Sequence, residues 1–140
     1  MRGRRTQARE IALKVLYQLD ITGDPVENGL KNYFKNHRVS VSHQQFVTQL
    51  VQGACEHRKQ IDGTLSERAT NWTLKRMAIV DRNILRLGAF ELLFDLGTPP
   101  KVVINEAVEL AKRFGTTDSR KFVNGVLDAI HKTKDSPSTP

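Results

Sequence analysis

The first nine residues, MRGRRTQAR, hold four arginines and no acid, and the first carboxylate of the chain is that of Glu10. A guanidinium group donates paired hydrogen bonds to phosphate and stacks on bases, so clustered arginines suit the binding of single-stranded RNA. The four residues are Arg2, Arg4, Arg5 and Arg9. They are the leading candidates for chemistry in this sequence, and that chemistry is polyanion binding.

Two other interpretations of this basic segment compete with polyanion binding. One is a solvated helix start, but positive charge there opposes the helix macrodipole, so four arginines are a poor choice for stability alone. The other is a transit peptide, which would also be rich in arginine and poor in acids. Here, however, the arginines lead straight into a core-forming helix that carries Glu10 and Asp20. The basic segment is therefore predicted to bind a polyanion.

The segment RKFVNGVLD, residues 120–128, repeats the pattern on a smaller scale. Arg120 and Lys121 fall in the expected first turn of the last helix, where acids would be preferred. This turn is a second candidate anion contact. Gly125 interrupts the same helix at a cost of roughly 1 kcal/mol relative to alanine. A close backbone contact would explain that glycine.

Patterns for catalysis or metal binding have little support. The sequence has no Gly-rich phosphate loop and no Gly-x-Ser-x-Gly elbow. Its histidines and its cysteine lack metal-ligand spacing; they are His37, His43, His57, His131 and Cys55. Glu106 and Glu109 lie three residues apart, but the Glu-x-x-His partners of a carboxylate metal site are missing. The sequence therefore predicts a protein that is not an enzyme and holds neither cofactor nor metal.

The composition fits one small domain with a substantial core. The chain has 140 residues, 39% of them hydrophobic, and a net charge of +7 from 22 basic and 15 acidic residues. No apolar run approaches the roughly 18 residues of a membrane helix, so no membrane partner is expected. The single cysteine excludes an internal disulfide and suits a reducing compartment, in agreement with a cytoplasmic location.

The spacing of apolar residues predicts an all-α fold of about seven helices, because no segment shows the alternation of a strand. The expected helical segments are 8–19, 26–36, 42–62, 65–72, 81–96, 101–114 and 118–130. Ser42 and Gln45 form a potential capping box for the third segment. The segment 81–96 is apolar on almost every side, which is typical of a central helix.

The two ends of the chain raise separate questions. If the first helix extends back from Ala8, the arginines form a stripe beside its buried face; if it does not, Gly3 leaves Arg2 and Arg4 on a flexible arm. Residues 135–140 form a polar, Pro-containing tail that is expected to be disordered.

Four motifs, in this order, resemble the NusB transcription antitermination factor family. They are ARExALxxLYxxD from Ala8 to Asp20, DRxILRLGxFEL from Asp81 to Leu92, VINEAVELAKRFG from Val103 to Gly115, and KFVNGVLD from Lys121 to Asp128. The last two are the most specific, and the resemblance covers nearly the whole chain.

The resemblance implies a fold and a function. The fold is a single all-α domain over residues 1–134, with two packed three-helix bundles at about 1–62 and 63–134. The function is non-enzymatic: with NusE, a ribosomal protein of the small subunit, such a factor binds boxA in nascent single-stranded RNA. It promotes read-through by RNA polymerase, notably in ribosomal RNA operons. The alternative is a NusB-like RNA-binding or protein-interaction module without an antitermination role.

The resemblance also assigns RNA-binding residues. Arg5 and Arg9 match arginines of the family's RNA-binding start. Thr6 and Gln7 stand where relatives often have further arginines, and this chain places Arg2 and Arg4 just upstream instead. At the start of the last helix, the matching candidates for RNA contact are Lys121 and Phe122, although Phe122 equally fits a core position.

The resemblance implies protein partners as well. Tyr17 and Asp81 match positions of the NusE-binding surface. The oligomeric state stays open between a monomer and a weak homodimer. A NusB-like domain also precedes some RNA cytosine methyltransferase domains, but a chain that ends at Pro140 is not expected to hold one.

Overall fold

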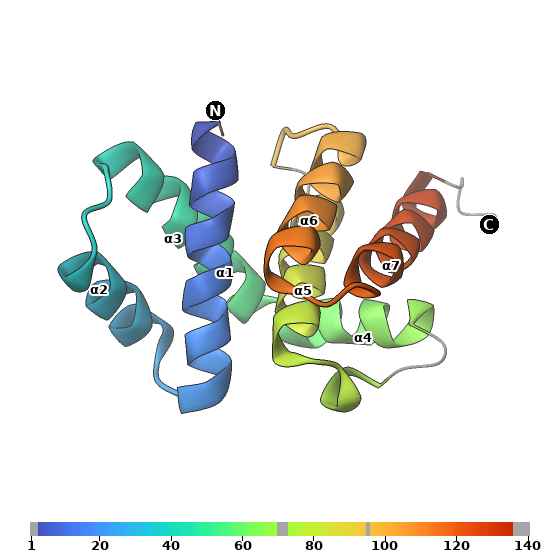
Figure 1. The fold of residues 1–140 in the computed structure, drawn as a ribbon, viewed down its shortest axis with the longest axis horizontal. Helices are drawn as coiled ribbons and strands as arrows, with labels where there is room; N and C mark the ends of the chain where they lie inside the picture. Colours follow the sequence, from blue (N-terminus) through green and yellow to red (C-terminus); the bar gives the residue numbers. More distant parts are fainter. Residues whose placement is uncertain (1–2, 70–72, 95, 136–140) are drawn as a thin grey trace. The chain divides into compact units, whose positions relative to one another are not determined.

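The computed structural model describes residues 3–69, 73–94 and 96–135, and this part of the chain contains helices and no strand (Figure 1). The helices are α1 (Arg4–Thr22), α2 (Val26–Asn36), α3 (Val41–Glu56), α4 (Arg58–Arg68), α5 (Ile79–Phe94), α6 (Pro100–Phe114) and α7 (Ser119–Asp135), with a 3-10 turn, η1, at Leu74–Arg76. The predicted all-α fold of about seven helices is confirmed. No helix in the described ranges is long and apolar enough to cross a bilayer.

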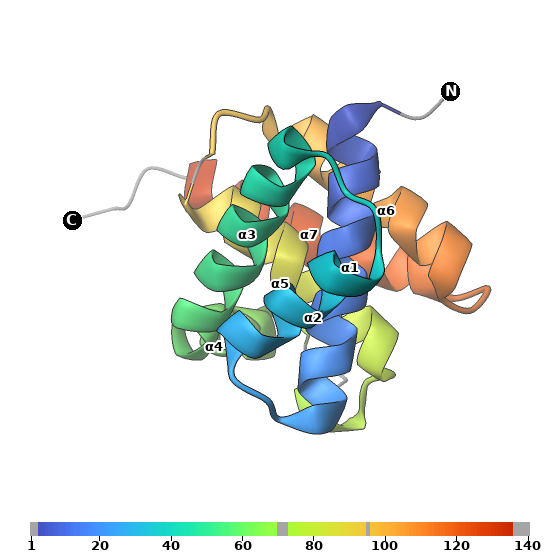
Figure 2. The ribbon, with the colours of Figure 1, turned by 90° about the vertical axis from the view of Figure 1, so that its left-hand side faces the viewer.

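The chain divides into two compact units, residues 1–56 and 57–140. In the first unit, α1 packs against both α2 and α3 (Figure 2). Most of the predicted apolar face of α1 is buried, at Ala8, Ala12, Val15, Leu16 and Leu19, and Ile11 is half-buried. Gly23 ends α1 in the left-handed conformation (φ 73°), and its N–H donates to the carbonyl oxygen of Leu19 at 2.8 Å. This is a turn that glycine adopts without strain.

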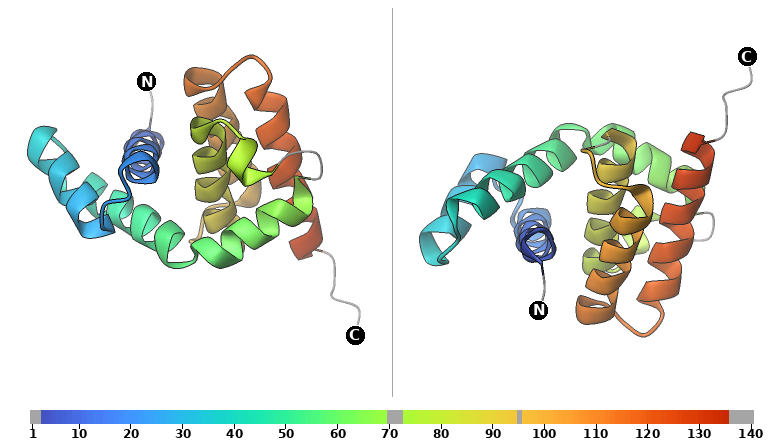
Figure 3. Two further views of the ribbon diagram at one scale, coloured as in Figure 1. Left: turned by 90° about the horizontal axis from the view of Figure 1, so that it is seen from below. Right: turned by 90° about the horizontal axis from the view of Figure 1, so that it is seen from above.

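In the second unit, α5 is the central helix. All of its residues from 83 to 92 are buried, as predicted from an apolar surface on every side. The helix α6 packs on both α5 and α7, and α4 contacts α5 and α7 (Figure 3). The predicted segment 101–114 matches α6. The last helix, α7, continues to Asp135, the first residue of the tail expected to be disordered; the rest of that tail lies outside the described residues.

The third predicted helix differs from the structure, because it is two helices rather than one. The chain leaves helical geometry at His57 (φ −103°, ψ 20°), between α3 and α4. The His57 ring stacks on Phe94, with 4.2 Å between ring centroids. Apolar spacing continues across the break to the buried Ile61, so periodicity alone predicted an unbroken helix.

The start of α3 and the expected segment 65–72 also differ from the prediction. The side chain that caps the start of α3 is that of Ser40 and not that of Ser42. The Ser40 hydroxyl accepts a hydrogen bond from the backbone N–H of His43 at 3.3 Å. Leu65 belongs to α4 and Ala69 caps its end, whereas Trp72 lies outside the described residues.

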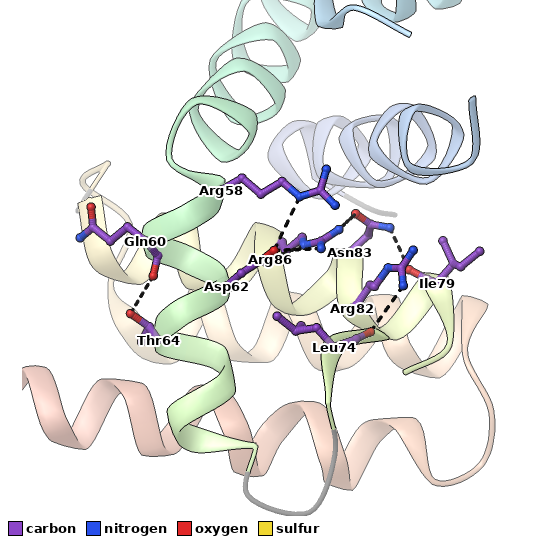
Figure 4. Close-up of polar contacts among 9 residues, drawn as sticks. All are labelled: Arg58, Gln60, Asp62, Thr64, Leu74, Ile79, Arg82, Asn83 and Arg86. Carbon is purple, nitrogen blue, oxygen red and sulfur yellow. Dashed lines mark hydrogen bonds and ion pairs between the residues drawn. The ribbon is translucent and has the colours of Figure 1, made fainter. Parts of the chain in front are cut away.

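An ion pair joins α4 to α5 (Figure 4). Arg86 donates from Nε to Oδ1 of Asp62 at 2.8 Å and from Nη2 to Oδ2 at 3.0 Å. Arg58 approaches the same carboxylate, with its Nε 3.6 Å from Oδ2. The Arg86 residue is only 7% exposed, so this two-pronged contact supplies the counter-charge that a buried guanidinium requires.

Candidate nucleic-acid interface

The basic start of the chain is largely helical. Gly3 is the N-cap of α1 and has extended backbone, and the helix begins at Arg4. Of the two arrangements left open by the sequence, the helix therefore extends back to include Arg4, Arg5 and Arg9, whereas Arg2 lies outside the described residues. The first turn of α1 contains no acidic residue. The helix thus begins with positive charge and without an acid in its first turn, where its macrodipole favours negative charge.

One aromatic ring of α3 lies beneath two of these arginines. The guanidinium carbon of Arg5 is 4.0 Å from the Phe46 ring centroid, and that of Arg9 is 5.4 Å away. Such distances are those of cation–π contacts. Arg5 is exposed, but Arg9 is only 3% exposed. Arg5 therefore presents charge at the surface, and Arg9 helps to join α1 to α3.

A pocket adjoins this cluster in the first unit. It has a volume of about 170 Å³ and is lined by Arg5, Ala8, Ser42, His43 and Phe46. Its walls come from the beginnings of α1 and α3. These two segments are more than 30 residues apart in the chain, so their spacing in the sequence does not indicate that they meet.

The start of α7 forms a second candidate surface, in the second unit. Lys121 and Arg120 are exposed, Phe122 is half-buried, and the first turn contains no acid. Phe122 and Asp81 line the same pocket of about 240 Å³. Ser119 donates from its hydroxyl to Oδ1 of Asp81 at 2.8 Å, which fixes the carboxylate at the start of α7.

No metal site accompanies these surfaces in the described residues. Within residues 3–69, 73–94 and 96–135, no three His, Cys, Asp or Glu side chains form a group that could hold a metal ion. Glu109 is exposed and Glu106 half-buried, each on α6.

The sequence profile of the NusB family matches residues 6–132 of this chain. The chain belongs to the NusB family. It is 46% identical over 131 residues to the transcription antitermination protein NusB of Anaeromyxobacter dehalogenans, covering 93% of this chain and 92% of that protein. Transcription antitermination is thus the function of this NusB chain.

Two solved structures of the family are similar to this fold. NusB of T. maritima has a TM-score of 0.86 and 36% identity, covering 94% of this chain and 93% of that one. The second is a chain from a crystal structure of the antitermination factors NusB and NusE in complex with double-stranded RNA. It has a TM-score of 0.83 and 33% identity, with 95% and 99% coverage.

Tyr17 is exposed on α1. A second exposed apolar residue on the same helix, Ile21, was not predicted from the sequence. Ile21 stands one turn further along the same face and is 57% exposed. The two exposed side chains form a short apolar strip that is a candidate protein contact. The position of Ile21 four residues after Tyr17, outside the buried face of α1, could have indicated from the sequence that the two residues lie side by side.

The explanation expected for Gly125 is wrong. A Cβ atom built on this residue meets nothing within 4 Å among the described residues, so no close internal contact requires the glycine. Close contacts occur at other glycines, among them Gly88 of α5, where a Cβ would lie 2.7 Å from Cδ1 of Leu127.

Proposed function

We propose that this NusB protein binds a boxA element of nascent single-stranded RNA together with NusE, and that this assembly promotes read-through by RNA polymerase, notably in ribosomal RNA operons. Family membership across residues 6–132 carries the proposal. The acid-free, arginine-rich start of α1 supports it from the physical side, because it sacrifices helix stability for an exposed positive charge.

The RNA-binding residues of the proposal divide into two groups. Arg2, Arg4 and Arg5 supply charge to phosphates from the start of the chain, and Arg9 acts through its position above Phe46. Lys121 and Phe122 form the second group, at the start of α7. The exposed Lys121 provides charge, and the half-buried ring of Phe122 offers an edge or face to a base.

The NusE-binding residues of the proposal are Tyr17 and Asp81. Tyr17 and its neighbour Ile21 give α1 an exposed apolar strip for a protein partner. Asp81 offers a carboxylate whose position is set by Ser119. The protein acts by binding rather than catalysis, and its place of action is the cytoplasm, where nascent RNA and ribosomal protein meet.

Fluorescence anisotropy tests the proposal. A labelled boxA RNA and a scrambled RNA of equal composition are titrated with the protein, with and without NusE, at fixed salt. We expect a preference for boxA that increases when NusE is present. Equal, weak binding to both RNAs, unaffected by NusE, would contradict the proposal and leave a generic polyanion surface.

The salt dependence provides a second readout. If three or four phosphates are neutralised, the slope of log affinity against log salt concentration is about −2 to −3, at roughly −0.7 per contact on single strands. A slope near zero would exclude the arginines as phosphate ligands.

A further inference from the structure

We infer that the pocket between the starts of α1 and α3 is a phosphate subsite for the RNA backbone, in which Arg5 and His43 hold the same phosphate group. The inference rests on the proposed RNA-binding function and extends it to a residue, His43, outside the arginine segment. Both side chains line the pocket, together with Ala8, Ser42 and Phe46.

The Arg5 side chain is available to a ligand. Its guanidinium lies over the Phe46 ring and makes no ion pair with a carboxylate of the described residues. A ring contact restricts the position of a guanidinium without using its N–H donors. Arg5 is therefore held beside the pocket with hydrogen-bonding capacity to spare.

The His43 side chain has one atom without a hydrogen-bond partner in the described residues. Its Nε2 is buried and has no hydrogen-bond partner within the described part of the chain. A buried polar atom without a partner costs more free energy than a hydrogen bond normally contributes, so a ligand that bonds to it removes this cost. A phosphate oxygen, which accepts hydrogen bonds, satisfies the Nε2–H tautomer.

The electrostatics around the pocket favour an anion. Ser42 and His43 stand in the first turn of α3, and neither α1 nor α3 has an acid in its first turn. Two helix starts thus bring positive partial charge to a pocket that already contains a guanidinium.

The geometry also favours phosphate over a base. Stacking of a base needs an aromatic face, and the nearby ring is that of Phe46, which is only 8% exposed. The Arg5 guanidinium covers this ring at 4.0 Å. The pocket thus presents hydrogen-bond donors rather than a free stacking surface.

The test compares boxA RNA affinities of the full-length protein and its variants by anisotropy at fixed pH and salt. We expect H43L to weaken binding by about tenfold, because one charge-assisted hydrogen bond is lost. H43Q, which keeps a side-chain N–H donor, should recover most of that affinity. The role of His43 is overturned if H43L binds boxA RNA as tightly as the wild type. It is also overturned if H43Q binds as weakly as H43L.

A double-mutant cycle asks whether Arg5 and His43 hold one phosphate. R5A should weaken binding by about tenfold and make the salt slope shallower by about 0.7. The R5A/H43L protein should bind only slightly more weakly than the weaker single variant, because residues that share one ligand are coupled. Losses that multiply independently would overturn a shared site.

Two matched controls separate the pocket from general effects. R38A removes one exposed arginine of the same unit that does not line the pocket, so its effect on affinity should be smaller than that of R5A. H37L removes an exposed histidine and should leave RNA affinity near the wild-type value. Far-UV circular dichroism and thermal unfolding verify that each variant is folded.

NMR of the His43 imidazole, at constant pH and ionic strength, distinguishes a site for the RNA backbone from a site for free phosphate. We expect its resonances to shift on addition of stoichiometric boxA RNA, and inorganic phosphate to cause a shift only at far higher concentration. Saturation by inorganic phosphate as readily as by RNA would overturn an RNA subsite. A wild-type protein with no boxA preference contradicts the proposed function, whereas unchanged affinity in H43L contradicts the pocket alone.

Discussion

Two groups of arginines, one in each unit, are held in opposite ways. In the second unit, Arg86 is buried and both of its contacts with Asp62 are 3.0 Å or shorter. In the first unit, Arg5 lies on the Phe46 ring and pairs with no carboxylate of the described residues. A carboxylate uses the N–H donors of a guanidinium, whereas an aromatic ring leaves them available. The group that each guanidinium contacts thus distinguishes the two arginines. Arg86 contributes to the stability of the fold, and Arg5 keeps its donors available for a ligand.

The energetic consequences of the two arrangements also differ. A buried pair costs desolvation on folding, and removal of one partner leaves an uncompensated charge inside the protein. An exposed arginine on a ring contributes little to stability, and here it also opposes the dipole of α1. We therefore expect substitutions in the second unit to change stability, and substitutions at the basic start to change RNA binding.

The largest expected effect is that of Asp62→Ala. It removes the carboxylate to which the buried guanidinium of Arg86 donates two hydrogen bonds, so the free energy of unfolding should fall by about 2–3 kcal/mol. Urea denaturation followed by circular dichroism measures the change. The RNA affinity of the folded variant should match the wild type.

Arg58→Ala is the control for that substitution. The Arg58 side chain is 53% exposed and lies 3.6 Å from Asp62, so its loss should cost less than about 1 kcal/mol. If both variants lose the same free energy of unfolding, the burial of Arg86 does not determine the contribution of Asp62. The contrast between Arg86 and Arg5 would then be contradicted.

Phe46→Leu should have an intermediate effect. Leucine fills most of the buried volume, so the free energy of unfolding should fall by about 1 kcal/mol. The ring beneath Arg5 is lost, however, and RNA affinity should fall about threefold although no charge is removed. Anisotropy and urea denaturation on one preparation separate the two effects. Wild-type affinity in this variant would show that the ring does not position Arg5.

The fold was largely predictable because its information is local. Apolar spacing at 3.6 residues identified α1, α5 and α6, and the apolar surface of α5 on every side correctly indicated the central helix. The break at His57 was missed because apolar spacing continues across it to the buried Ile61. The His57 ring stacks on Phe94, 37 positions later, and nothing in the local sequence marks that contact.

The candidate site was predictable in residue type but not in geometry. Charge and spacing identified the arginines, and four of them looked equivalent in the sequence. The structure distinguishes Arg9, which is nearly buried, from Arg5, which is exposed. His43 gave no signal, because its importance depends on a pocket formed by two helix starts that are far apart in the chain.

Gly125 and Gly88 differ in the space that surrounds them, and this difference predicts opposite effects of alanine on stability. A Cβ at Gly125 of α7 meets nothing within 4 Å in the described structure, so Gly125→Ala should raise the free energy of unfolding by about 0.5–1 kcal/mol. Gly88→Ala should instead destabilise the protein, because its Cβ would lie 2.7 Å from Leu127. Thermal unfolding measures both. A weaker RNA affinity in the Gly125 variant would indicate that RNA approaches this backbone closely.

The smallest expected change in stability is that of Arg4→Glu, and it tests the comparison most directly. Position 4 is the first residue of α1, where a carboxylate interacts favourably with the helix dipole, so the free energy of unfolding should rise by about 0.5 kcal/mol. RNA affinity should fall at the same time, because a positive charge has been replaced by a negative one beside the phosphates. A variant that is both more stable and weaker in RNA binding would show that the basic start is maintained for its ligand at the expense of the helix. A variant with lower stability and unchanged affinity would show that Arg4 serves the fold, as Arg86 does.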